Sequence, residues 1–181
     1  AAPAGIIPVK LLVDDNEPGV RRVWEERLRR RLAEVSEIIF RHCHVRFKVV
    51  AVGSWQSDDR ITDFNESLRE FELAATPSPG MIAIGFTSQY ELSRKHNPVG
   101  GTRGPLHSHV LVRETAPKFT EAERVQTLVH ELGHVLGAVH SADPSSVMRP
   151  KMTDRRARAQ KFRIHFDEIN TLAMYLVCEE L

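Results

Sequence analysis

The sequence predicts a mixed α/β (α+β) domain, and two observations support this. Short runs rich in β-branched residues alternate with longer stretches of helical periodicity, which is the order of a mixed sheet with helices packed against it. The 181 residues are 41% hydrophobic and 27% charged, as in globular chains that bury a core. We therefore expect a single domain that spans residues 1–181.

Three strands and one long helix are expected in the first half of the chain. The strands are the short apolar runs Val9–Val13, Val45–Val52 and Met81–Phe86. A helix from Pro18 to about Arg41 is indicated by apolar residues at steps of three and four. These residues are Trp24, Leu28, Leu32, Val35 and Ile39. A long helix between two strands predicts a right-handed crossover, and residues 58–72 predict a loop followed by a short helix.

The second half predicts two further strands and two helices. Leu106–Arg113 alternates polar and apolar residues, and Pro98–Gly101 predicts a short edge strand. Thr120 and Glu123 form a capping box, in which each side chain pairs with a free backbone donor at the start of a helix. The apolar stripe of this helix is Val125, Leu128, Val129, Leu132 and Leu136. The last helix is expected over Asp167–Val177, with Ile169, Leu172, Ala173 and Leu176 facing inward.

Charge and targeting signals restrict the function little. The 25 Lys and Arg nearly cancel the 24 Asp and Glu, so bulk charge favours neither a nucleic acid nor a membrane surface. No stretch approaches the roughly 20 apolar residues of a membrane-spanning helix, and we expect no transmembrane segment. The first five residues lack the basic and apolar regions of a signal peptide. Cys43 and Cys178 can pair or stay free.

The informative stretch runs from residue 130 to residue 140. His130 and His134 are four residues apart on the expected helix, so their side chains lie on one face, one turn apart. This face lies roughly opposite the apolar stripe. One side of the helix is therefore expected to pack on the sheet, while the other presents two imidazoles to a metal ion.

His140 can join these ligands only if the helix ends before it. Six further residues of helix rise by about 9 Å, whereas ligand atoms on one tetrahedral zinc ion lie within about 3.5 Å of each other. Gly137 stands where a left-handed residue would end the helix without a Cβ penalty. Its position therefore makes the third histidine usable.

Three histidine ligands predict a catalytic zinc site, because they leave one coordination position open. Zinc in such a site polarises a carbonyl group and lowers the pKa of water toward about 7. Glu131, next to the first ligand, can take the proton of the water and pass it to the leaving amine. The predicted chemistry is metal-assisted hydrolysis of an amide.

These residues carry a resemblance to a known family. The motif HExxHxxGxxH of the metzincin zinc endopeptidases is matched in full by His130, Glu131, His134, Gly137 and His140. Met148 occupies the place of the methionine in the Met-turn of that family. Ser141, Pro144 and the run Met148-Arg149-Pro150 are most similar to the matrixin branch.

The resemblance implies a metzincin-like zincin fold. Such a fold has a mixed twisted sheet, a long backing helix, an active-site helix and a small C-terminal lobe that ends in a helix. It implies an upper lobe up to about residue 137, a lower lobe over 138–181, one catalytic Zn²⁺ ion and Met148 as the floor of the site. Peptide substrate is expected to pair with an edge strand and to reach a pocket beside the Met-turn. The candidate cleft residues are Val99, Gly100, Gly101, Pro150, Lys151 and Met152.

Some features depart from the matrixin pattern. No aspartate-rich loop of the kind that binds calcium or structural zinc lies between Thr87 and Glu114, which leaves calcium dependence open. Arg149-Pro150 stands where some metzincins carry a tyrosine. No cysteine-containing inhibitory segment precedes the domain here, so any pro-segment or inhibitor is expected outside this chain. The resemblance implies a peptide or protein substrate and a secreted or extracytoplasmic location.

The remaining histidines favour ordinary structural roles. His107 and His109 share one face of a strand, but such pairs are usually exposed or hydrogen-bonded. The same interpretation is favoured for His42, His44 and His165. The glycines of residues 100–104 lack the Lys-Ser/Thr of a phosphate loop and indicate a turn or bulge.

A basic tract gives the alternative function. Residues 149–163 hold a run of cations opposed only by Asp154, and a solvated face is the favoured interpretation. These cations are Arg149, Lys151, Arg155, Arg156, Arg158, Lys161 and Arg163. The main hypothesis is a zinc-dependent endopeptidase, or one that processes a single target, with no nucleic-acid partner expected. The alternative is a non-catalytic zinc-containing module that uses the tract to bind an anionic partner.

Overall fold

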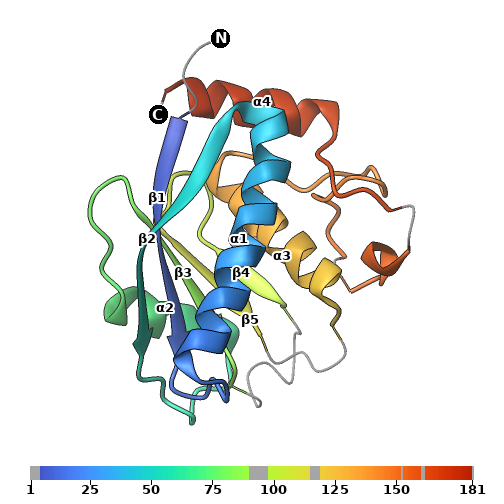
Figure 1. The fold of residues 1–181 in the computed structure, drawn as a ribbon. Coiled ribbons are helices and arrows are strands. Elements are labelled where there is room, and N and C mark those ends of the chain that lie inside the picture. The colour runs from blue at the N-terminus through green and yellow to red at the C-terminus, as the bar shows by residue number, and fades with distance from the viewer. Residues whose placement is uncertain (1–4, 90–97, 115–118, 152, 160–161, 181) are drawn as a thin grey trace.

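A five-stranded sheet with helices on both faces forms the centre of the computed structural model, which describes residues 5–89, 98–114, 119–151, 153–159 and 162–180 (Figure 1). The elements are β1 (Gly5–Asp14), α1 (Arg21–Cys43), β2 (Val45–Trp55), α2 (Phe64–Ala74), β3 (Ile82–Thr87), β4 (Gly100–Thr102), β5 (His109–Arg113), α3 (Glu121–Val135), a 3₁₀ turn (Arg156–Arg158) and α4 (Glu168–Glu179). Every element expected from the sequence is present, with ends displaced by a few residues. The predicted mixed α/β fold is confirmed.

The sheet has the strand order β2-β1-β3-β5-β4. The strands β1, β2, β3 and β5 are parallel, and β4 pairs antiparallel with β5 at the edge. The parallel pairing of β1 with β2 agrees with the crossover expected through α1. The short edge strand expected at residues 98–101 is found at Gly100–Thr102. This strand lies beside α3, the helix that carries His130 and His134, so this edge of the sheet borders the two histidines.

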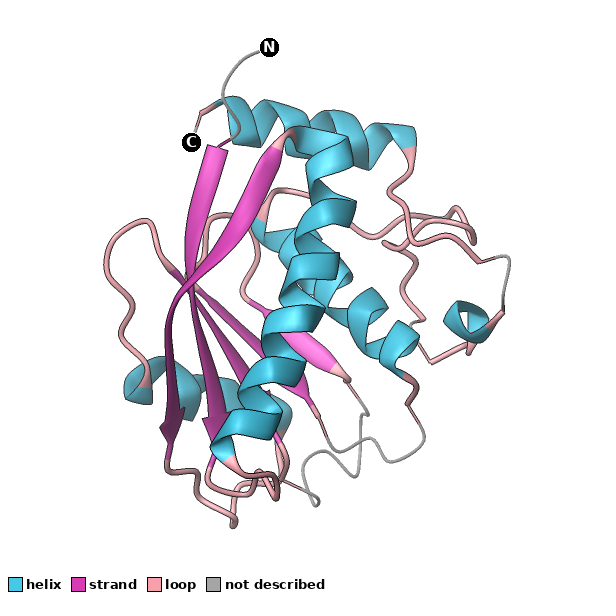
Figure 2. Cartoon of the chain, viewed as in Figure 1, coloured by secondary structure: helices cyan, strands magenta, loops and turns pink. Residues whose placement is uncertain are grey.

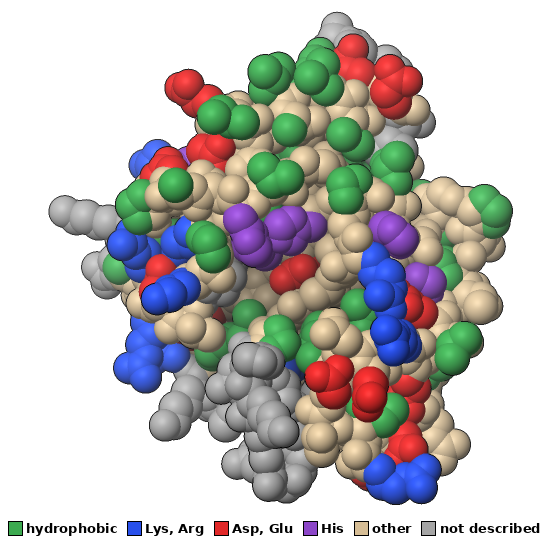
Figure 3. All heavy atoms as spheres, turned by 180° about the vertical axis from the view of Figure 1, so that it is seen from behind, with side chains coloured by type: hydrophobic (Ala, Val, Ile, Leu, Met, Phe, Trp, Pro, Cys, Tyr) green, Lys and Arg blue, Asp and Glu red, His purple; other side chains and the backbone are tan. Residues whose placement is uncertain are grey.

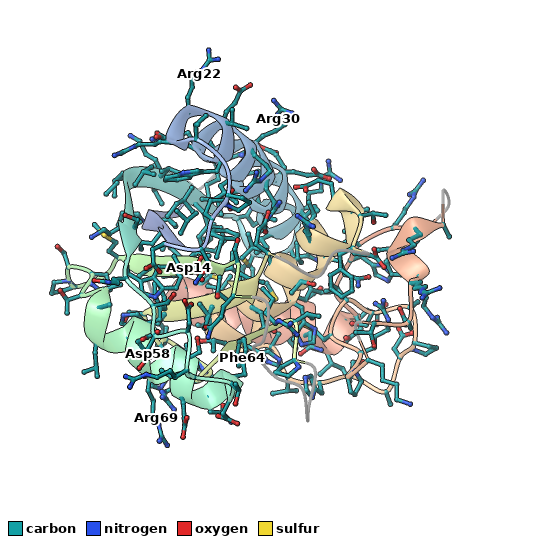
Figure 4. All side chains as sticks on the ribbon, turned by 90° about the horizontal axis from the view of Figure 1, so that it is seen from below. Asp14, Arg22, Arg30, Asp58, Phe64 and Arg69 are labelled. Atoms are coloured by element: carbon teal, nitrogen blue, oxygen red, sulfur yellow. The ribbon has the colours of Figure 1, made fainter. Side chains whose placement is uncertain are left out.

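The helices cover opposite faces of the sheet because side chains alternate along each strand. Val9, Leu11 and Val13 of β1 join the larger core cluster, which also holds the buried faces of α1 and α3. Leu12 points the other way, into a second cluster formed with α2. Figures 2 and 4 show α1 and α2 on opposite sides of the sheet, with Arg22 and Arg30 pointing away from it. Each large apolar side chain buried in this way contributes about 1.5–3 kcal/mol.

The two cysteines connect α1 with α4 without a covalent bond. Cys43 is the last residue of α1 and Cys178 lies on α4, and both thiols are free in the structure. A hydrogen bond between the two side chains lowers the pKa of the Cys43 thiol and raises the pKa of Cys178. Of the two alternatives that the sequence leaves open, the structure therefore has the free thiols, in contact with each other.

The last helix starts near its predicted position but buries a different face. Ile169, Leu172 and Leu176, which were expected to point inward, are 77%, 60% and 59% exposed. Asn170 and Met174 are buried in their place. The predicted inward face of α4 was therefore wrong for these three residues, while Ala173 is half-buried.

Polar contacts explain the orientation of α4. The side chain of Asn170 forms hydrogen bonds with the backbone of Val139, which requires this residue to face inward. Val177 lies so close to Gly137 that a β-carbon placed there would be 2.7 Å from Val177 Cγ2. These contacts rotate the helix by about one residue, or 100°, from the orientation that its apolar pattern predicts.

None of the helices in the described part of the chain is both long and apolar enough to span a membrane.

Candidate metal centre

The helix α3 carries the first part of the site and begins at the predicted capping box. The Thr120 hydroxyl accepts a hydrogen bond from the Glu123 N–H at 3.3 Å, and the Glu123 carboxylate accepts one from the Thr120 N–H at 2.7 Å. The helix is more enclosed than its pattern predicted, because the polar side that bears His130 and Glu131 is buried as well. On this side it is covered by β4 and by the segment around Val147.

The end of α3 brings the chain back toward the two helical histidines. Gly137 has a φ of +96°, a conformation that glycine adopts without a Cβ penalty. The Gly137 N–H donates to the His134 carbonyl at 3.1 Å, and the Ala138 N–H donates to the Gly133 carbonyl at 2.9 Å. These two bonds form a Schellman motif, which ends a helix and turns the chain. The predicted role of Gly137 is confirmed.

The turn gathers His130, His134 and His140 into one group. One ring nitrogen from each histidine lies within 4.8 Å of the other two. The ring centroids are 4.7 Å apart for His130–His134, 5.3 Å for His130–His140 and 4.9 Å for His134–His140. His130 is buried and His140 is exposed, so the group opens to solvent on one side. Figure 3 shows histidine side chains gathered on this face, next to hydrophobic side chains.

Hydrogen bonds determine which nitrogens are available to a metal ion. His130 Nδ1 lies 2.8 Å from the Val147 carbonyl oxygen, and His134 Nδ1 lies 2.9 Å from the Ala138 carbonyl oxygen. A carbonyl only accepts, so both Nδ1 atoms carry the hydrogen and both Nε2 atoms keep a lone pair when the rings are neutral. Burial favours neutral rings, since it lowers the pKa of His130 to about 4 and also lowers that of His134.

The two Nε2 atoms lie 3.1 Å apart. With both hydrogens on Nδ1, two lone pairs face each other at this distance and repel unless a cation lies between them. Two ligand nitrogens at about 2.1 Å from one tetrahedral zinc ion are about 3.4 Å apart. Histidine ligands commonly donate their second ring N–H to a backbone carbonyl, as both do here. His130 and His134 therefore fit one zinc ion, and His140, with a ring nitrogen within 4.8 Å of theirs, is the candidate third ligand.

The side chain of Glu131 extends from α3 toward the edge strand β4. A β-carbon placed on Gly100 would be 3.0 Å from Glu131 Cγ and 3.2 Å from its Oε1 atom. The glycine thus allows β4 to approach the Glu131 carboxyl closely. Burial raises the pKa of this carboxyl to about 8, and a dication held nearby would lower it again. The structure thereby brings one predicted cleft residue, Gly100, to the predicted catalytic residue, whereas its neighbour Gly101 faces Phe64 of α2.

Met148 lies directly beneath the metal-binding part of α3. Its side chain is fully buried, and a β-carbon placed on Gly133 would be 2.9 Å from its sulfur atom. Gly133 precedes His134, so the methionine packs against the helix next to a predicted ligand. This position is compatible with the floor role expected of Met148, which stays a prediction.

Part of the basic tract is internal rather than solvated. Arg149 is buried and forms two hydrogen bonds with Asp154, at 2.6 and 2.8 Å. It also donates to Gln126 of α3 at 2.8 Å, and Arg158 donates to Glu123 at 2.8 Å. The interpretation of the whole tract as a solvated face was wrong for Arg149, whereas Arg158 stays exposed while it pairs with Glu123 of α3.

The other predicted cleft residues lie at the edges of this region. The Val99 carbonyl accepts a hydrogen bond from the Arg113 N–H at 2.8 Å, next to β4. Pro150 and Lys151 are exposed and directly follow the buried Met148-Arg149 pair. Met152 lies outside the described residues, as does Lys161 of the basic tract.

The remaining histidines have the structural roles that the sequence favoured. His109 contacts Ser108 and the Ala75 carbonyl, and His42 contacts Thr171. His44 ends α1 with a φ of 56°. His165 contacts the Arg163 carbonyl. In the described part of the chain they join no further group of metal-ligating side chains.

The sequence reasoning missed two polar residues that support the site. Gln126 holds Arg149, and Asn170 holds the backbone of Val139. Asn170 could have been noticed, because it lies one turn before the buried Met174 on the same helix face.

Replacing Gly137 with alanine is expected to destabilise the protein by more than the ordinary cost of a left-handed alanine. The new β-carbon would lie 2.7 Å from Val177 Cγ2, in addition to the strain of about 1 kcal/mol at positive φ. At about 2–4 °C per kcal/mol, the thermal midpoint should fall by at least about 4 °C.

Gly80→Ala is the matched control for this substitution, because Gly80 also has a positive φ, but a β-carbon placed there has no other atom within 4 Å. It should lower the midpoint by about 2–4 °C only. Equal losses in the two variants would show that the contact with Val177 contributes nothing.

Comparisons with known proteins agree with the geometry. The crystal structure of archaemetzincin from Methanopyrus kandleri aligns with a TM-score of 0.65, over 96% of this chain and 96% of that chain, at 18% sequence identity. It supports the metzincin-type fold. No curated protein sequence matches the chain. The sequence model of the matrixin family of peptidases matches residues 51–175, which is more than half of the chain and includes the three histidines. The chain therefore belongs to the matrixin family and is a zinc metallopeptidase of the metzincin type.

Proposed function

We propose that this protein is an endopeptidase in which His130, His134 and His140 hold one catalytic zinc ion and Glu131 is the general base and acid. The observation that supports this most strongly is the pair of Nε2 atoms 3.1 Å apart, both with their Nδ1 hydrogens committed to backbone carbonyls. With neutral rings the two lone pairs repel each other, and a metal ion bound between them removes this repulsion. A histidine cluster of this kind next to a buried carboxyl group is the arrangement of residues that metal-assisted hydrolysis requires.

Each residue has a distinct part in the proposed reaction. When bound, zinc supplies Lewis-acid polarisation of the substrate carbonyl and acidifies water. The carboxylate of Glu131 accepts the proton of the attacking water and delivers it to the nitrogen of the leaving amine. Its location next to the backbone of Gly100 supports a proton transfer close to a substrate bound along β4. The backbone carbonyls of Val147 and Ala138 hold the His130 and His134 rings in orientation.

We place the substrate on the edge strand β4. This strand pairs with β5 on one side, and no other described strand pairs with its second side. An extended peptide can add to such an edge through main-chain hydrogen bonds at Gly100, because main-chain groups alternate between the two sides of an antiparallel strand and those of Val99 point to β5. Main-chain pairing does not need a free terminus of the peptide, which favours cleavage within a chain. Pro150 and Lys151 are proposed to line the pocket for one substrate side chain.

The alternative function, a binding module, is favoured less by the geometry. Two cations of the basic tract, Arg149 and Arg158, pair with acidic groups of the same domain. Exposed cations such as Arg155 and Arg163 remain on the surface. Action outside the cytoplasm is likewise proposed, and it rests on membership of the family alone.

A peptide library tests the proposal. The zinc-loaded protein should cut peptides at internal bonds, as found by mass spectrometry of the new termini, and a chelator should stop the cleavage until zinc is restored. Fragments that arise only by removal of terminal residues would contradict an endopeptidase. Salt-sensitive binding to heparin or DNA, without cleavage in the library or in a protein extract, would favour the binding module.

A further inference from the structure

The third histidine lacks the support that holds the other two. His130 and His134 lie on α3, and each ring is held by a hydrogen bond to a backbone carbonyl. His140 is exposed and lies beyond the end of the helix. Among the described residues, no hydrogen bond to the His140 ring is present. The position of this ring is therefore set by the backbone on its two sides, and on the far side the Ser141 N–H donates to the Met148 carbonyl at 2.9 Å.

Asn170 binds that backbone from α4. Its Oδ1 atom accepts a hydrogen bond from the Val139 N–H at 2.8 Å, and its Nδ2 atom donates one to the Val139 carbonyl at 3.0 Å. The amide thus pairs with both polar groups of the residue next to His140, as a neighbouring strand would. Asn170 is almost fully buried, and hydrogen bonds in such an environment are costly to lose.

Asp167 fixes the orientation of the Asn170 amide. Its Oδ2 atom accepts a second hydrogen bond from Asn170 Nδ2 at 2.8 Å, and its Oδ1 atom accepts one from the Asn170 backbone N–H at 3.0 Å. With Nδ2 bound to two acceptors, Oδ1 must point toward the Val139 N–H. The amide cannot turn over without losing its three side-chain hydrogen bonds, two to Val139 and one to Asp167.

The same carboxylate reaches the segment that supports His130. Asp167 Oδ2 also accepts from the Ser146 hydroxyl at 2.7 Å, and Ser146 Oγ accepts from the Met148 N–H at 3.1 Å. Val147, between these two residues, supplies the carbonyl that orients His130. The start of α4 is therefore connected to both ends of the histidine group.

From these contacts we infer that Asn170 is a positioning residue for the metal, which holds the Val139 backbone so that His140 reaches the ion bound by His130 and His134. The inference rests on the proposed zinc site. Asparagine suits the task because it offers a donor and an acceptor together. Aspartate of the same size would set a carboxylate against the Val139 carbonyl and the Asp167 side chain.

Zinc affinity is the measurement that tests this role. Competition with a chromophoric chelator should show that Asn170→Ala binds zinc about 10–100-fold more weakly than the wild type, the usual loss when support of a ligand is removed. The visible spectrum of the cobalt-substituted protein should change as well, because one ligand is displaced. Asn170→Asp retains the size of the side chain and should weaken binding in the same direction.

Ser36→Ala is the matched control. Ser36 is buried on α1, and its hydroxyl accepts a hydrogen bond from the Phe47 N–H at 2.9 Å. Its loss leaves a buried backbone group unpaired, as in Asn170→Ala, but away from the histidines. This variant should be less stable than the wild type, yet keep its zinc affinity and cobalt spectrum. An equal loss of zinc affinity in this control would overturn the inference.

A double-mutant cycle separates the inference from the proposed function. If Asn170 acts through His140, then Asn170→Ala should weaken zinc binding little or not at all in a His140→Ala background. A full additional loss there would overturn the inference, as would wild-type affinity in both Asn170 variants. In either case the zinc site would stand, provided that the wild type binds one zinc ion. A wild type that binds none would overturn the proposed function itself.

Discussion

Replacing Glu131 with glutamine will abolish peptide cleavage while the zinc ion stays bound. Glutamine has nearly the same volume and fits the same space beside Gly100, but it cannot accept the proton of the attacking water. General acid–base groups contribute about 10²–10⁴-fold to the rate, so we expect turnover to fall by about a thousandfold or more. Zinc content should not change, because the three histidines hold the metal without this carboxyl group.

The experiment needs turnover and zinc content from the same preparations. Glu168→Gln, an exposed position at the start of α4, serves as a control of equal chemistry and should keep full activity. Undiminished cleavage by Glu131→Gln would refute the mechanism. Loss of zinc together with activity would instead make Glu131 a ligand.

Replacing His134 with alanine will remove both the zinc ion and the activity, and it will also remove the stabilisation that zinc provides. A ligand present at about 1,000 times its Kd stabilises the folded state by about 4 kcal/mol. For a domain of this size that corresponds to a rise of about 8–16 °C in the thermal midpoint. The wild type should show this rise on addition of zinc, and His134→Ala should show little of it.

His165→Ala is the control for the loss of an imidazole. His165 contacts the Arg163 carbonyl and is not part of the histidine group. Its variant should respond to zinc as the wild type does. A zinc-dependent rise that persists in His134→Ala, or that disappears in His165→Ala, would show that zinc binds somewhere else.

The site was predictable because its chemistry imposes a fixed spacing. His130 and His134 share a helix face at four residues, and His140 becomes a ligand only after a turn at a residue that tolerates positive φ. The observed φ of +96° at Gly137 follows from that requirement. The long helix α1 and the buried strands were equally clear, since their apolar periodicity determines which side faces the core.

The orientation of α4 and the role of Arg149 were not predictable in this way. Ile169 and Leu172 belong to the more apolar stripe of α4, but hydrogen bonds between the Asn170 side chain and the Val139 backbone outweigh that preference and leave both residues exposed. Arg149 looked like one cation of a solvated run, yet it is buried against Asp154 and Gln126. Contacts between a polar side chain and a distant segment have no periodic signature, so only the folded chain reveals them.

Anomalous diffraction at the zinc edge from crystals of the zinc-loaded protein would show directly whether the three imidazoles coordinate one zinc ion. We predict one peak, within about 2.1 Å of a ring nitrogen of His130, His134 and His140, with no protein side chain in the fourth position. A peak that His140 does not approach, or one whose fourth position is filled by another side chain of the protein, would contradict a catalytic zinc site.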